Sequence, residues 1–135
     1  MNTHDVLQQT FQACPFHRYL RAELRVLEPG LVEVEIPWFE DLDQAMGRLH
    51  GGVYAALLDA SSYYAALSAY TSLSQLPLTQ EYKINLLRSV EKEPLVGRSR
   101  VLQAGRKVAV VETRISSPSV ELAAIGLTSL VIRTR

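Results

Sequence analysis

A long apolar segment between Gly51 and Tyr70 places the strongest constraint on how this chain can fold. The segment is rich in Ala and Leu, contains no Pro and has no Gly after Gly52. It therefore predicts one helix with a length on the order of 30 Å at 1.5 Å per residue. Asp59 is its only charged residue. A helix that is apolar on nearly every side is a buried helix, so the rest of the chain must cover it.

The segments on both sides of this helix alternate apolar and polar residues, which is the period of a half-buried β-strand. Two such segments precede the helix and predict a hairpin around the turn Glu28-Pro29-Gly30. The others follow it without a further helix, and the last three are predicted to form an antiparallel meander. The predicted strands cover residues 20–26, 32–38, 81–86, 96–104, 108–115 and 122–132.

The N-terminal segment completes the order of elements. Apolar residues near helical spacing between Val6 and Ala13 predict a short amphipathic helix that Pro15 stops. Pro77 is predicted to end the region of the long helix. The order is then a short helix, two strands, the long buried helix and four strands. The sequence therefore predicts an α+β fold, in which one antiparallel sheet curls around the central helix and carries its charges on the outer face.

Length, charge and cysteine content limit the class of protein. With 135 residues and a mass of 15.1 kDa, the chain fits a single domain spanning residues 1–135. The 14 Lys and Arg residues balance 14 Asp and Glu residues, which argues against a nucleic-acid-binding protein. Cys14 is the only cysteine and excludes an intrachain disulfide. We expect no signal peptide and no membrane span, and hence a cytoplasmic protein.

His50-Gly51-Gly52 stands where an irregular loop, residues 39–49, enters the long helix. The first amides of a helix have no intrahelical acceptors, and they lie at the positive end of the helix dipole. Such N–H groups suit a developing oxyanion, and glycine lets a ligand approach closely. The other interpretation is a glycine-rich helix start with a histidine that caps or packs.

Asp59 lies in the middle of this helix, among Leu57, Leu58 and Ala60. Asp is a poor interior helix residue, and burying an unpaired carboxylate costs several kcal/mol or forces its protonation. These costs favour a functional role. The alternatives are a small exposed strip or a hydrogen bond to a neighbouring strand. Asp59 is roughly 13 Å from His50 along the helix, so both act on one bond only if a two-fold related copy supplies one of them.

The segment Gly47-Arg48-Leu49-His50-Gly51-Gly52, followed by Leu57-Leu58-Asp59, resembles the signature of PaaI-like (phenylacetate-pathway type) hotdog thioesterases. The resemblance extends from about Phe16 to Val131 and includes residues 28–30, 82–88 and 105–107. It implies the hotdog fold, in which a six-stranded antiparallel sheet wraps one long helix.

Carried over residue by residue, the resemblance implies the catalytic groups. The Gly51 amide would polarise a thioester carbonyl, and Asp59 of the facing subunit would act as general base on water or as nucleophile. Gln44 would position the acyl group or the water, Thr79 would hold the water, and His50 would orient the loop or assist Gln44.

The resemblance also implies contacts with the substrate. Arg106 and Lys107 match a basic pair near the phosphates of CoA, and Arg88 adds to it. The other implied substrate contacts are Gly52, Ser62 and Tyr63. This sequence has Ala60 where relatives often have a Thr after the helix carboxylate, which leaves the hydrogen-bond partner of Asp59 open.

Several of these residues also have ordinary structural interpretations. Thr79 equally suits the start of a strand, Arg106-Lys107 a solvated turn, Gln44 a loop, and Tyr63 the core. The predicted activity is hydrolysis of an acyl-CoA or aryl-CoA thioester without a metal or cofactor. The expected assembly has a homodimer as its minimal unit, and the resemblance implies a dimer-of-dimers tetramer as its full form. A non-catalytic acyl-CoA-binding module and, last, a hotdog dehydratase are the alternatives.

Overall fold

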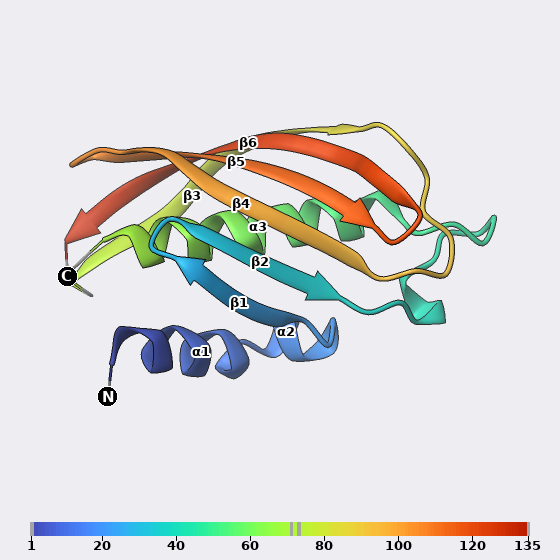
Figure 1. Cartoon of the computed structure of the whole chain (residues 1–135), viewed down its shortest axis with the longest axis horizontal. Helices are drawn as coiled ribbons and strands as arrows, with labels where there is room; N and C mark the ends of the chain where they lie inside the picture. Colours follow the sequence, from blue (N-terminus) through green and yellow to red (C-terminus); the bar gives the residue numbers. More distant parts are fainter. Residues whose placement is uncertain (1, 71, 73, 135) are drawn as a thin grey trace.

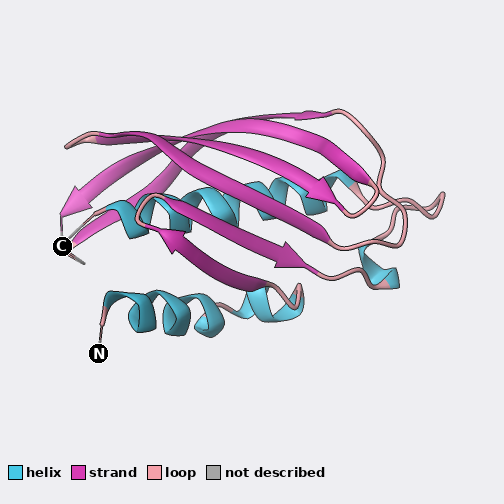
Figure 2. Ribbon diagram, in the orientation of Figure 1, coloured by secondary structure: helices cyan, strands magenta, loops and turns pink. Residues whose placement is uncertain are grey.

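The computed structural model describes residues 2–70, 72 and 74–134 and shows one curved sheet around one long helix (Figures 1 and 2). The strands follow the order β1-β2-β4-β5-β6-β3, and every neighbouring pair is antiparallel. The helices are α1 (Thr3–Ala13), α2 (Pro15–Tyr19), the short 3-10 turn η1 (Glu40–Leu42) and α3 (Gly51–Ala69). The strands are β1 (Glu23–Glu28), β2 (Leu31–Ile36), β3 (Gln75–Leu86), β4 (Leu95–Ala104), β5 (Val108–Ser117) and β6 (Val120–Thr134).

The helix α3 lies in the concave side of the sheet, as its apolar sequence predicts (Figure 1). Leu57, Leu58, Ala65 and Ala66 on α3 have no exposed surface. Buried residues of β2, β4, β5 and β6 pack against them from the sheet. The α+β hotdog fold is confirmed, and so is the meander β4-β5-β6. No helix in the described part of the chain has both the length and the apolar character needed to cross a membrane.

Two prolines act differently from the prediction. Pro15 was expected only to stop the first helix, but it also opens α2 as the first residue of that helix. Its ring fixes a helical φ, and its missing N–H is at a position that needs no intrahelical bond. Pro77 was expected to end the helical region, but α3 ends at Ala69 and Pro77 lies inside β3. β3 is an edge strand paired only with β6, which is where a sheet tolerates proline.

The inner face of β6 leaves no space for a side chain at Gly126. A Cβ atom there would lie 2.2 Å from Leu58 Cδ1 and 2.6 Å from the Lys83 carbonyl oxygen. The leucine can rotate, but the carbonyl belongs to the backbone of β3. We therefore expect Gly126→Ala to destabilise the fold by about 1–3 kcal/mol, measured by urea unfolding. Leu127→Ala, on the neighbouring and half-exposed residue, is the control, and an unchanged midpoint for Gly126→Ala would contradict the prediction.

Candidate active site

Asp59 and Thr79 form the polar centre of one half-site. Thr79 lies in β3 and its hydroxyl donates a 2.8 Å hydrogen bond to Asp59 Oδ1. The second oxygen of Asp59, Oδ2, has no hydrogen-bond partner among the described residues. Thr79 is thus the hydrogen-bond partner of Asp59, in place of the threonine that relatives often have at the position of Ala60. The predicted alternative of a hydrogen bond between Asp59 and a neighbouring strand is confirmed. The carboxylate is half-buried, with one oxygen fixed and one available.

A cavity of about 390 Å³ opens beside this pair. Its walls come from α1, α2, α3 and β3. Most of its lining is apolar or aromatic; the principal residues are Phe16, Ala56, Ala60, Tyr63, Tyr64 and Leu78. Such a lining suits the apolar part of a ligand, with Asp59 and Thr79 as the polar groups that orient it.

His50 and Gly51 form a second half-site at the start of α3. His50 caps the helix, because its Nδ1 accepts a 2.8 Å hydrogen bond from the Gly52 N–H. Its backbone N–H donates to the Leu42 carbonyl at 2.9 Å, which fixes the preceding loop. The histidine therefore does cap the helix, while Gly51 lines a separate hollow of about 200 Å³ together with Gln44 and Arg88.

One chain does not bring the two half-sites together. Gly51 and Asp59 are eight residues apart on one helix, which is about 12 Å along its axis. Gln44 lies on the Gly51 side, where its Oε1 accepts from the Met46 N–H. No three His, Cys, Asp or Glu side chains of the described residues cluster as metal ligands would.

The predicted substrate contacts fall in different places. Tyr63 lines the Asp59 cavity, and Gly52 lines a shallow hollow next to it. Ser62 is fully buried and its hydroxyl donates to the Asp59 carbonyl, so the structure places it in the interior. Arg106 and Lys107 lie in the β4–β5 turn. Tyr70, which follows the end of α3, donates a hydrogen bond to the Gly105 carbonyl at this turn. The turn is therefore at the opposite end of α3 from Arg88, which lines the Gly51 hollow.

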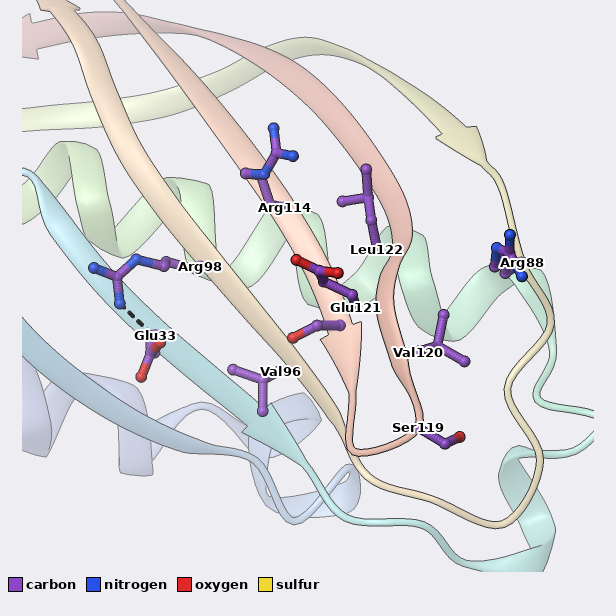
Figure 3. A pocket seen from close by; sticks show the side chains of 10 residues that line it. Glu33, Arg88, Val96, Arg98, Arg114, Ser119, Val120, Glu121 and Leu122 are labelled. Carbon is purple, nitrogen blue, oxygen red and sulfur yellow. Dashed lines mark hydrogen bonds and ion pairs between the residues drawn. The ribbon is translucent and has the colours of Figure 1, made fainter.

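A further hollow, of about 680 Å³, lies on the outer face of the sheet (Figure 3). Its charged residues include Arg98, which donates to Glu33 at 3.0 Å, and Arg114 and Glu121. Arg88 stands at its end and also lines the Gly51 hollow. The outer face carries the charges as predicted, and this hollow does not include Asp59.

His17 is a cavity residue that no sequence pattern indicates. Only 9% of its surface is exposed, and it lines the Asp59 cavity. Its ring stacks on Phe11 at a centroid distance of 4.1 Å. Burial lowers the pKa of the imidazole, against opposing contributions from the Phe11 carbonyl and the negative charge of Asp59. His17 is therefore neutral in the folded protein near neutral pH.

This lowered pKa predicts how stability changes with pH. Below the ordinary histidine value of 6.5, the unfolded chain takes up a proton at His17 that the folded chain resists. The free energy of unfolding should therefore fall as the pH drops through this range. His17→Phe should reduce this dependence, whereas the exposed His4→Gln should not. Melting temperatures measured from pH 7.5 to about 5 test this, and identical slopes in all three proteins would contradict it.

Comparison with known proteins identifies the family. The family model described as "Thioesterase superfamily" matches residues 46–124, more than half of the chain and inclusive of both half-sites. A protein from Saccharolobus solfataricus named "Putative esterase SSO2140" is 34% identical over 119 residues, which cover 87% of this chain and 84% of that protein. The chain belongs to the thioesterase superfamily. Thioester hydrolysis is its general activity.

Solved structures agree with this thioesterase fold. A thioesterase family protein from Silicibacter pomeroyi superimposes with a TM-score of 0.93 at 27% identity, covering 99% of this chain and 100% of that one. A hypothetical thioesterase from Streptococcus pneumoniae, solved with coenzyme A, has a TM-score of 0.75 at 19% identity and shows the fold alone. It covers 84% of this chain and 87% of that one. The resemblance to hotdog thioesterases is thereby confirmed, and the PaaI-like subtype stays a prediction.

Proposed function

We propose that this thioesterase hydrolyses acyl-CoA thioesters in sites shared between the two subunits of a homodimer. The observation that carries the proposal is the separation of Asp59 from Gly51 on one helix. A carboxylate that attacks and an amide that stabilises the oxyanion must both reach one carbonyl group. Two chains related by a two-fold axis can supply one group each.

The free edge of β3 supports such a dimer. Among the described residues this strand pairs only with β6, and it exposes 42% of Tyr82 and 54% of Leu86. An exposed edge with apolar side chains is a template for pairing with another strand. A two-fold axis near Tyr82 and Lys83 would make the two β3 strands antiparallel and complete one continuous sheet.

That pairing also brings the half-sites together. Thr79 and Leu86 lie on opposite sides of the proposed axis, at nearly equal distances along β3. Thr79 holds Asp59, and a Cβ atom on Gly51 would lie 3.0 Å from Leu86 Cδ1. Antiparallel pairing would therefore bring Asp59 of one subunit near the partner's Gly51.

The proposed reaction uses the two groups on one thioester. The Gly51 N–H donates to the carbonyl oxygen and stabilises the negative charge that develops there. Asp59 Oδ2 takes a proton from water while the water oxygen bonds to the carbonyl carbon; direct attack by Oδ2 is the alternative. The C–S bond then breaks, the acid is released, and the CoA thiolate takes up the proton.

Basic residues near Gly51 support CoA as the leaving group. Arg88 lines the Gly51 hollow, where its guanidinium suits a phosphate. With antiparallel helices, the partner's Arg106-Lys107 turn would lie on the same side as Arg88. The Streptococcus pneumoniae relative, whose structure contains coenzyme A, is consistent with this choice. A dimer of such dimers stays a prediction that light scattering can test.

A complementation experiment tests the shared site. Asp59→Asn and Gly51→Pro each remove one group, and a mixed dimer of the two keeps one intact site. Co-expression with random pairing should restore about a quarter of wild-type thiol release from acyl-CoA, because half of the dimers are mixed and each has one working site of two. Each variant alone is the control. A mixture as inactive as the single variants would contradict the shared site. A wild-type protein that binds acyl-CoA but never hydrolyses it would favour the alternative of a non-catalytic acyl-CoA-binding module.

A further inference from the structure

His17 is held in the wall of the Asp59 cavity by contacts on three sides. Its Nδ1 lies 3.0 Å from the Phe11 carbonyl oxygen, which makes Nδ1 the protonated nitrogen of a neutral ring. The Phe11 ring stacks on one face, and the Tyr64 ring meets it edge-on at 5.9 Å between centroids. These contacts fix both the orientation and the tautomer of the imidazole.

The fixed tautomer leaves the other ring nitrogen as a hydrogen-bond acceptor. In a neutral histidine with a proton on Nδ1, Nε2 carries a lone pair. Nε2 has no partner among the described residues, although it is not sealed from solvent. Because burial lowers the pKa of His17, the ring stays neutral and keeps this lone pair near neutral pH.

His17 lines a cavity that otherwise resembles an apolar binding site. Phe16 and Tyr63 supply aromatic surface, and Ala56 and Ala60 leave room beside the helix. The titratable groups that line the same cavity with His17 are Cys14, Asp59, Tyr63 and Tyr64. Thr79 occupies Asp59 Oδ1, and the proposed reaction uses Oδ2, so His17 is a separate acceptor in the lining of this cavity.

We propose that His17 is a specificity-determining residue, whose Nε2 accepts a hydrogen bond from a hydroxyl group on the acyl part of the substrate. This inference rests on the proposed function, because it takes the Asp59 cavity as the acyl site. An acyl group that lacks the hydroxyl would leave the acceptor unpaired when it displaces water from the cavity. Such unpaired polar groups are the strongest source of discrimination between similar substrates.

The test compares matched CoA thioesters that differ by one hydroxyl group. Suitable pairs are hexanoyl-CoA with 6-hydroxyhexanoyl-CoA, and benzoyl-CoA with its 3-hydroxy and 4-hydroxy derivatives. Wild type should have a higher kcat/KM for at least one hydroxylated member. His17→Phe keeps the aromatic packing and should lower that preference about five- to tenfold, the worth of one neutral hydrogen bond. His17→Gln, which can present an amide oxygen, should retain part of it.

Controls separate this inference from the proposed function and from misfolding. His4→Gln alters an exposed histidine on α1 and should leave the preference unchanged. Melting temperature and circular dichroism report whether His17→Phe folds, and the preference is a ratio of two kcat/KM values in one protein, which a general loss of activity does not change. If wild type hydrolyses the thioesters with no preference for hydroxylated members, or His17→Phe keeps that preference, the inference is wrong while the proposed function stands. If wild type hydrolyses none of them, both fail.

Discussion

Asp59→Asn is expected to lower kcat on the best acyl-CoA substrate by about a hundredfold to ten-thousandfold, the usual contribution of a general base. The amide has nearly the same shape as the carboxylate, and its oxygen can still accept the 2.8 Å hydrogen bond from Thr79. The change therefore removes the ability to take a proton or attack a carbonyl, with little change in packing. KM should change little, because the carboxylate acts on the reacting bond. Steady-state thiol release gives both constants.

Two further variants complete this experiment. Asp59→Ala also removes the side chain that Thr79 holds, and we expect it to be as inactive as Asp59→Asn. Asp5→Asn alters an exposed carboxylate on α1 and should keep full activity. Undiminished hydrolysis in both Asp59 variants would eliminate the proposed mechanism. Neither variant should destabilise the fold by much, since the carboxylate is only half-buried.

The long helix was the most predictable part of the fold, and the edge strand the least. α3 begins at Gly51 and ends at Ala69, within one residue of the predicted end, because an unbroken apolar run has few alternatives to a buried helix. β3 begins at Gln75, before the predicted start between Thr79 and Glu81. Its first half contains Pro77, which the sequence marks as a break, but an edge strand tolerates proline.

The candidate site shows a similar division between local and long-range information. The distance between Gly51 and Asp59 could be predicted from the sequence, because both lie on one helix of known rise. The bond from Thr79 to Asp59 joins residues twenty positions apart through the placement of β3. His17 was missed because its partner is the Phe11 carbonyl and its cavity forms only when α2 packs against α3. A lone histidine between Phe16 and Arg18 carries no sequence signal of this kind.

Gly51→Pro is expected to lower kcat by about a hundredfold to a thousandfold, because it deletes the amide proposed to stabilise the oxyanion. Proline suits this position, since Gly51 is the first residue of α3 and its N–H has no intrahelical acceptor. His50 already has the extended backbone that precedes proline, with φ −66° and ψ 136°. The helix should therefore form as before. Thiol-release kinetics and the melting temperature measure the two effects separately.

Gly51→Ala is the matched control, because it adds a methyl group and keeps the N–H. That methyl group would lie 3.0 Å from Leu86 Cδ1, the end of a flexible side chain, so a small shift of the leucine accommodates it. We expect Gly51→Ala to retain activity within a few-fold while Gly51→Pro loses it, which isolates the hydrogen-bond donor from the bulk at this position. Equal losses in both variants would mean that close approach of the substrate, and not the amide, is what Gly51 provides. A Gly51→Pro protein that folds and keeps full turnover would show that the Gly51 amide at the start of α3 takes no part in the reaction.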